Sequence, residues 1–433
     1  MSVQRDRFDE TEERLLKDAL STNNLWPYRG SEFAPYMKQA ASMVEKHFST
    51  SDRDAFMVPT SSGTSSIQVA LGGLKIPPGS EVIVSPITDP GSVTPILFHN
   101  TIPVFADVSP TSGLVTPDTV AAALTRRTSA VIAVHLTGSP VDVPGIRQRL
   151  EDLGRGDVKI IEDVAQGLGA TLNNVPLGMM GDAGCFSLNS HKHITVGEGG
   201  FVLLHNEDDF YRSHNFSDKH RDRLGGGDKK PEHGRYQGPG HSLRMSELQG
   251  AMLEAQLPKL MEFAAARTAF GLTLGKRLAE LSDIVPQEHL KGAVPTFFGL
   301  MFRTQNAVEL NRKSVAIDEI ESRLEHLGTS IGGSYTADDE PIYKYPLFQN
   351  RAFSTSHDGL WPAELVAAHY HNDIQLGHYD YTKVSCPQAE NYLKRAFWVR
   401  VHEKYTTDHA VQIADTIVDV FDDLGLAERH ASP

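Results

Sequence analysis

Short runs of apolar, often β-branched residues alternate with helix-like stretches between about residues 55 and 205. In the stretches 117–127 and 143–154, apolar residues recur at the spacing of one helix face. Strands separated by helices are typical of parallel βαβ units, so the pattern predicts an α/β domain with a mainly parallel sheet. Ligands of such sheets bind beyond the carboxyl ends of the strands. The predicted strands span residues 81–86, 101–108, 128–136, 158–164, 184–188 and 199–204.

The segments on either side of this region have other patterns. Residues 1–50 are charged and predicted to be helical, apart from a loop around Trp26 and Pro27. Residues 219–241 are rich in glycine and charged side chains, which predicts a long mobile loop.

A second, smaller domain is predicted after this loop. The amphipathic pattern from Arg244 predicts a helix that runs to about residue 281. Residues 282–425 mix strand and helix patterns, as an α+β domain does, and end on a helix. We therefore predict an N-terminal segment and large domain over residues 1–260, and a linking helix and smaller domain over residues 261–433.

Composition narrows the class of protein. The chain has 433 residues, with 41 basic and 55 acidic side chains and a formal net charge of −14, which argues against a nucleic-acid binder. Two cysteines, Cys185 and Cys386, are too few for a disulfide framework and favour a reducing compartment. The first residues carry no apolar signal segment, and no apolar stretch approaches the length of a membrane span. These observations predict a soluble cytoplasmic protein that binds neither nucleic acid nor membranes.

The small residues SSGTSS at 61–66 precede a helix-like run. At a helix start such residues expose backbone N–H groups, and the helix dipole favours a phosphate there. The alternative is an ordinary Ser/Thr N-cap. The Gly-Lys-Ser/Thr element of a Walker loop is missing, so the segment is a candidate phosphate turn of another kind.

Two carboxylates follow the apolar strand predicted at 158–164. Glu162 and Asp163 end this run, and burial at a strand end costs desolvation energy unless a partner compensates it. A cofactor cation such as a protonated pyridine nitrogen would be one partner. A helix cap or a structural salt bridge is the alternative.

Lys192 lies between two predicted strands, just before the glycine-rich turn GEGG at 197–200. A lysine in a polar turn is often solvated and inert. A Schiff-base lysine instead needs desolvation or a nearby cation to keep it neutral enough to attack a carbonyl. His191 and His193 flank it, and no further Cys/His cluster at ligand spacing accompanies them, so no metal site is predicted.

These segments together resemble the DegT/StrS family of pyridoxal-5′-phosphate (PLP)-dependent sugar and cyclitol aminotransferases. That family has an SGT phosphate turn, an ED-x-A-Q segment, an FS-x(4)-K-x(4)-GEGG segment, and RMSELQ-x-A followed by QL-x-KL. A weaker likeness covers residues 386–408, CPQAENYLKRAFWVRVHEKYTTD. The matching segments lie at 62–64, 162–166, 186–200 and 244–260, and the lysine segment matches without a gap.

The resemblance implies fold type I of the PLP-dependent transferases, the aspartate-aminotransferase fold. This fold has a large domain with a mainly parallel mixed sheet between helices, and a smaller C-terminal α+β domain. The resemblance also implies a homodimer with shared active sites, in which the loop before Arg244 reaches the neighbour's phosphate.

Roles for single residues follow from the same resemblance. Lys192 would form the Schiff base with PLP and then carry a proton between Cα and C4′. Asp163 would pair with the pyridinium nitrogen and keep it protonated, which makes the ring an electron sink. Gln166 would lie near the ring hydroxyl. The cofactor phosphate would be held by Gly63, Thr64, Ser65 and Ser187.

Two positions depart from the family pattern. Asp89, in Thr88-Asp89-Pro90-Gly91, stands where the family often stacks an aromatic ring on the cofactor, so we place it among the cofactor-contacting residues. A turn with Asp as its first residue is the alternative. Ser242 and Leu243 replace the family's Asn-Tyr before Arg244, so Ser242 is the candidate for the contact between subunits.

The expected activity is an aminotransferase with L-glutamate or L-glutamine as donor and a keto-sugar, keto-cyclitol or other biosynthetic ketone as acceptor. Two alternatives stay open. One is elimination or cyclisation of an amino-acid-derived substrate, which an acidic Asp89 would favour. The other is a non-catalytic PLP-binding regulatory protein, against which the presence of both Lys192 and Asp163 counts. Substrate-binding residues are expected on the mobile loop and the second domain.

Overall fold

Seven strands form the main sheet of the computed structural model, in the order β3-β11-β10-β7-β6-β4-β5. The structure describes residues 7–30, 32–223, 236, 238–350, 361–371 and 379–430. The neighbouring pairs from β10 to β5 are parallel, and β11 runs antiparallel to both β10 and β3. The predicted mainly parallel α/β sheet is therefore confirmed. The strands are β3 (Phe56–Thr60), β4 (Glu81–Val84), β5 (Ile102–Phe105), β6 (Thr128–Val134), β7 (Lys159–Asp163), β10 (Ala183–Ser187) and β11 (Gly200–Leu204).

The strand β3 was not among the predicted strands, although it leads directly into the candidate phosphate turn. Its sequence contains Pro59, which lacks the N–H that a central strand needs on both sides. The sheet order places β3 at an edge, where only β11 pairs with it and a proline is tolerated. The other six strands match the predicted runs to within a few residues.

Helices cover both faces of this sheet, so its strands read as continuous apolar runs. Val82, Ile83, Val131 and Ile160, for example, are fully buried. The N-terminal helices α1 and α2 pack on α8, and a two-stranded ribbon, β1 (Tyr28–Arg29) with β2 (Glu32–Phe33), joins α1 to α2. The helices are α1 (Glu10–Ser21), α2 (Pro35–Phe48), α3 (Gly63–Gly73), α4 (Thr94–Phe98), α5 (Pro117–Ala123), α6 (Val143–Asp152), α7 (Glu207–Ser217) and α8 (Glu247–Gln256).

The helix predicted from Arg244 to residue 281 is two helices. The side chain of Ser246 caps α8 by accepting the N–H of Gln249, so the helix begins three residues later than predicted. A turn at Leu257–Lys259 then separates α8 from α9 (Leu260–Leu281). Pro258 explains the break, because a proline ring removes a backbone donor and clashes with the preceding turn of an α-helix.

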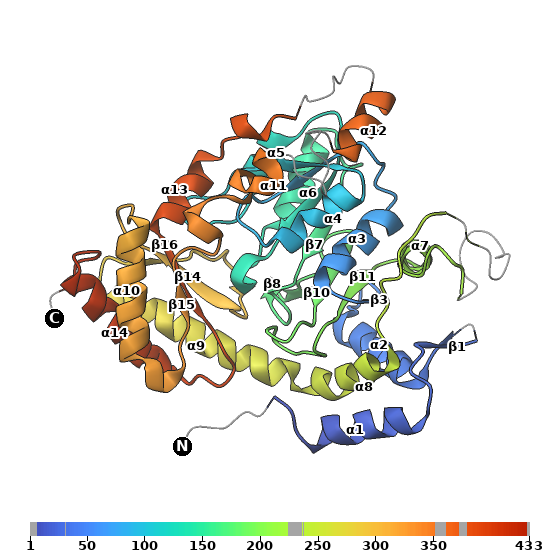
Figure 1. Ribbon diagram of the computed structural model, residues 1–433, viewed down its shortest axis with the longest axis horizontal. Helices are drawn as coiled ribbons and strands as arrows, with labels where there is room; N and C mark the ends of the chain where they lie inside the picture. Colours follow the sequence, from blue (N-terminus) through green and yellow to red (C-terminus); the bar gives the residue numbers. More distant parts are fainter. Residues whose placement is uncertain are drawn as a thin grey trace.

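A four-stranded antiparallel sheet follows α9. It consists of β12 (Val285–Pro286), β14 (Gly299–Arg303), β16 (Ala396–Arg400) and β15 (Ile331–Gly332), and it packs on α9, α10 (Leu310–Arg323) and α14 (Thr407–Asp423). Its strands β14, β15 and β16 lie beside α10 in Figure 1. The expected α+β character of this region is confirmed.

The division at residue 260 remains a prediction, although it coincides with the start of α9. Several described residues of the second half of the predicted smaller domain, including Tyr343, Phe348 and Tyr392, pack in the core of the seven-stranded sheet. Within the described part of the chain, no helix has both the length and the apolar character needed to cross a bilayer.

Residues 224–235 and 237 of the predicted mobile loop lie outside the described residues.

Candidate active site

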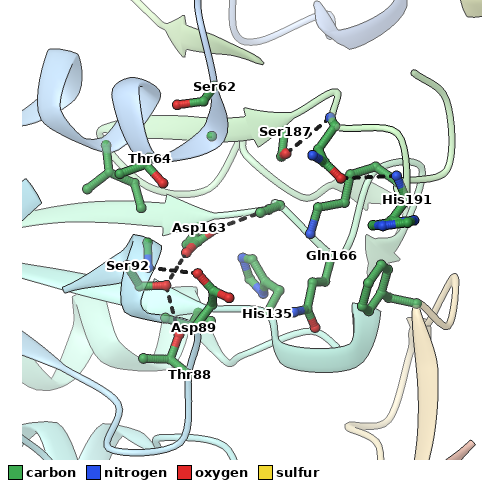
Figure 2. Close-up of a pocket in the computed structure, with 18 of the residues that line it drawn as sticks. Ser62, Thr64, Thr88, Asp89, Ser92, His135, Asp163, Gln166, Ser187 and His191 are labelled. Atoms are coloured by element: carbon green, nitrogen blue, oxygen red, sulfur yellow. Dashed lines mark hydrogen bonds between the residues drawn. The ribbon is translucent and has the colours of Figure 1, made fainter. Parts of the chain in front are cut away.

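A cavity of about 380 Å³ lies at the carboxyl ends of the parallel strands (Figure 2). Segments that follow β3, β4, β6, β7 and β10 form most of its wall, as the sheet topology predicts. Phe298, Tyr335 and Arg400, from segments of the four-stranded sheet, complete it. The cavity brings together most of the predicted site residues, namely Gly63, Thr64, Asp89, Asp163, Gln166, Ser187 and Lys192.

The start of α3 forms one end of the cavity. Ser62 caps the helix through its side chain, which accepts the N–H of Ser65, and its carbonyl accepts the N–H of Ser66. These bonds leave the N–H groups of Gly63 and Thr64 at the cavity, where the helix dipole favours an anion. The cap and the anion site, which the sequence presented as alternatives, are thus compatible.

Position 63 requires glycine because Ser187 lies very close to it at this end of the cavity. A side-chain carbon at this position would lie 2.8 Å from Cβ of Ser187, which is closer than two carbon atoms pack. The absence of a side chain therefore lets the helix start approach the end of β10, and the two segments together form a narrow polar cradle.

Two predicted phosphate-binding residues do not line the cavity. The hydroxyl of Ser65 bonds to the hydroxyls of Ser61 and Ser62, each at 2.9 Å. Ser242 is exposed and accepts a hydrogen bond from Arg244. Their roles in binding a phosphate remain predictions.

Asp163 ends β7 in the middle of the site, as Figure 2 shows. Its carboxylate accepts the hydroxyl of Ser92 at 2.6 Å and the N–H of Ala165 at 3.0 Å, and only 5% of the residue is exposed. Burial raises the pKa of Asp163 above its usual value, although these two hydrogen bonds and the charge of Lys192 oppose the shift. A cationic ligand group at the cavity would stabilise the ionised carboxylate.

Glu162 has a structural role, which was the alternative interpretation of the carboxylates Glu162 and Asp163. It is fully buried and accepts N–H groups from Gly178, Met180 and Gly181. Burial alone would raise its pKa, but the hydrogen bonds from His135 and from these N–H groups outweigh burial and lower it. Adjacent strand residues point to opposite faces, so Glu162 and Asp163 take different roles.

His135 is a site residue that the sequence did not indicate. Its Nδ1 accepts the N–H of Val141 at 3.0 Å, so the proton of the neutral ring is on Nε2, which donates to Glu162 at 3.0 Å. The ring is thus fixed in one orientation at the cavity wall. Ser92, which holds Asp163, was missed as well, although it lies only three residues after Asp89.

The amino group of Lys192 lies 4.5 Å from the centre of the Phe298 ring. Burial lowers the pKa of Lys192, and the carboxylates of Asp163 and Asp89 oppose this shift only in part. A larger fraction of this amine is therefore neutral than of an exposed lysine, which is the condition for attack on a carbonyl.

The turn that carries Lys192 is held by the N-terminal segment. The guanidinium of Arg7 donates to the carbonyls of Ser190 and Lys192 and to the carboxylate of Glu403 at 2.8 Å. Arg7 was not predicted, because nothing in the N-terminal pattern links it to a turn that lies 185 residues later.

Gln166 connects the two sheets at the cavity. Its carbonyl oxygen accepts the N–H of Thr137 at 2.7 Å, and its amide nitrogen donates to the hydroxyl of Tyr335. The side-chain amide therefore has a fixed orientation at the wall of the cavity that Asp163 and Lys192 also line.

Asp89 lies at the cavity, as predicted, and also forms the turn that was the alternative reading. One carboxylate oxygen accepts the N–H of Gly91 at 2.7 Å, which fixes the side chain next to Ser92 (Figure 2). An aromatic ring at this position would present a flat apolar face to a ligand, whereas Asp89 presents a negative charge.

The donor set fits a phosphorylated pyridine cofactor. The cradle at Gly63 and Ser187 suits a phosphate, Asp163 suits a protonated ring nitrogen, and the amine of Lys192 suits a carbonyl carbon between them. Each of these groups faces one continuous cavity. The cavity is large enough for a small cofactor and a reacting group.

Comparisons with known proteins agree with this chemistry. The L-glutamine:2-deoxy-scyllo-inosose aminotransferase of Streptomyces lividus is 34% identical over 275 residues, which are 61% of this chain and 61% of that protein. The alignments with three of the curated relatives cover 52%, 61% and 54% of the relatives' lengths, so the chain matches little more than half of each.

Solved structures match nearly the whole chain. The aminotransferase from Psychrobacter cryohalolentis has a TM-score of 0.77 at 24% identity, over 96% of this chain and 98% of that one. A GDP-4-keto-6-deoxymannose-3-dehydratase, solved with a trapped PLP-glutamate geminal diamine, has a TM-score of 0.72 at 19% identity, over 95% and 98% of the two chains. These likenesses confirm the predicted fold class.

The model of the DegT/DnrJ/EryC1/StrS aminotransferase family matches residues 37–359. This range begins in α2, contains the whole seven-stranded sheet and includes every predicted site residue. The chain therefore belongs to the DegT/DnrJ/EryC1/StrS aminotransferase family.

Proposed function

We propose that this protein is a PLP-dependent aminotransferase that moves an amino group from glutamate or glutamine to a keto-cyclitol or keto-sugar. The observation that carries the proposal is that Lys192 and Asp163 face one cavity whose end is the N-terminus of α3. The glutamine-dependent cyclitol aminotransferase from Streptomyces lividus supports the choice of donor and acceptor class.

The residues that would hold the cofactor have separate tasks in this proposal. The N–H groups of Gly63 and Thr64, with the hydroxyls of Thr64 and Ser187, hold the cofactor phosphate. Asp163 holds a proton on the ring nitrogen, and Ser92 keeps the carboxylate oriented. PLP, when bound, supplies an electron sink that stabilises negative charge on the substrate carbon.

Lys192 has two tasks. Its neutral amine would hold the cofactor, and the same Nζ would take a proton from the substrate carbon and return it. Both tasks need an amine that is partly unprotonated, which the burial of Lys192 favours.

An aminotransferase must run in two half-reactions, because the amino group stays on the cofactor between donor and acceptor. We therefore expect donor alone, without acceptor, to move the cofactor absorption from the visible band to the near ultraviolet, with a matching yield of 2-oxo acid. Glutamate, glutamine and alanine are supplied separately, and the kinetics with acceptor should be ping-pong.

The same experiment separates the alternatives. Ammonia release or a cyclised product from one amino acid, without the spectral change, would favour elimination or cyclisation. In that case Asp89 is the candidate for the additional acid or base, and Asp89→Phe should suppress the side chemistry. No response to any amino acid would favour a non-catalytic PLP-binding protein.

We also propose a homodimer in which the segment just before Arg244 of each chain, with Ser242, approaches the cofactor phosphate of the other. Light scattering of the holoenzyme should give at least twice the monomer mass of 47.5 kDa. Ser242→Ala should weaken cofactor binding if Ser242 makes the contact across the interface. A fully active monomer would contradict this arrangement.

A further inference from the structure

Arg400, the last residue of β16, presents its guanidinium at the active-site cavity. Its group lies 5.6 Å from the centre of the Phe298 ring, the ring that Lys192 also contacts. Among the described residues, no carboxylate lies within 4.0 Å of it. Burying part of a charge without a counterion is unfavourable, so a partner that arrives with a ligand would stabilise this residue.

A second cavity, of about 290 Å³, begins where Arg400 lies. It shares two wall residues with the active-site cavity, Arg400 and His191, so the two spaces adjoin. In Figure 2, His191 lies across the pocket from Thr64, so the second cavity adjoins the site on the side opposite the start of α3. Its other wall residues are Arg7, Ser190, Gly328, Ser330, His402 and Tyr405.

The charge around this second cavity is positive. Arg7 and Arg267 both bond to the carboxylate of Glu403, at 2.8 and 2.7 Å, so two guanidinium groups share one counterion and Arg400 adds a third cation. Burial lowers the pKa of His402 to about 4, so the histidine is neutral near pH 7. The chain as a whole carries a formal charge of −14, so this excess is a local feature and does not follow from composition.

We propose that the active site continues past Arg400 into this second cavity, and that Arg400 binds an anionic group, a carboxylate or a phosphate, carried by a substrate. This inference rests on the proposed function. A guanidinium presents paired N–H donors that match both anions. Arg400 and the amine of Lys192 both lie beside the Phe298 ring, so an anion bound by Arg400 would be at one end of a substrate whose other end reaches the amine. Substrates with such a group are favoured over neutral ones of the same size.

The test uses two probes that lack an amino group, succinate and inorganic phosphate, so that binding does not depend on transamination. Each is titrated into the holoenzyme by calorimetry, with the cofactor phosphate already in its cradle. We expect at least one probe to bind, and Arg400→Gln to weaken that binding at least tenfold. Which probe binds distinguishes a carboxylate substrate from a phosphorylated one.

Two further variants make the result decisive. Arg400→Lys keeps the charge and should lose only part of the affinity, and it also serves if Arg400→Gln does not fold. Arg323→Gln, an exposed arginine on α10, should bind like the wild type. Binding of neither probe, or equal binding to wild type and Arg400→Gln, would overturn the inference. The donor-alone spectral change would still be seen in that case, because it tests the proposed function independently.

Discussion

Lys192→Ala should fold, bind PLP without a covalent link and lose nearly all turnover. The substitution removes both the amine that attaches the cofactor and the group that moves the proton. Loss of a single acid–base group commonly costs 10²–10⁴ in rate, so removal of both tasks should cost about ten-thousandfold or more. Steady-state turnover with saturating cofactor measures this loss.

A matched control is Lys383→Ala, because the side chain of Lys383 is 82% exposed and the proposal gives it no part in the reaction. It should keep wild-type turnover. Substantial turnover by Lys192→Ala, with no contaminating enzyme, would mean that another lysine serves the cofactor.

Asp163→Asn should lower turnover by roughly a hundredfold or more, which corresponds to about 3 kcal/mol of transition-state stabilisation. The amide can still accept the hydroxyl of Ser92, so the fold should survive. It carries no charge, however, and cannot keep the ring nitrogen protonated. The protein should therefore retain the Lys192 Schiff base and its visible absorption while the reaction slows.

Asp118→Asn provides the comparison for this substitution, because the Asp118 side chain is 89% exposed. Its turnover should be unchanged. Near-normal turnover of Asp163→Asn would show that a different acid serves the ring nitrogen, and the assignment of Asp163 would then fail.

The sequence predicted those parts of the fold that depend on local patterns. Apolar runs gave six strands of the main sheet, and the small residues at 61–66 gave the start of α3. Proline accounts for two of the differences. Because of Pro59, the edge strand β3 was not predicted. Pro258 separates α8 from α9, where the amphipathic pattern predicted one continuous helix.

The candidate site was predictable where its residues belong to contiguous motifs. Lys192, Asp163 and Gln166 are of this kind. Arg7 and Arg400 are not, because each is a single basic residue, Arg7 ahead of α1 and Arg400 at the end of β16, with no spacing that links it to the lysine turn. Their contacts arise only when the N-terminal segment and the four-stranded sheet fold against the lysine turn.

The polar character of the cavity was predicted only in part. Asp89 drew notice because it stands where the family often has an aromatic ring, and it does lie at the cavity. Tyr335 and His135 were missed, since an isolated tyrosine or histidine has no spacing that distinguishes a site residue from a buried one. Their hydrogen bonds, to Gln166 and Glu162, became visible only in three dimensions.

Borohydride reduction of the resting holoenzyme, followed by peptide mass analysis, tests the central assignment most directly. Reduction makes the bond between cofactor and protein permanent, so the label reports which lysine holds PLP. The account predicts one pyridoxyl group on the peptide that contains Lys192, and none in Lys192→Ala. A pyridoxyl group on a different lysine of the wild-type protein would contradict it.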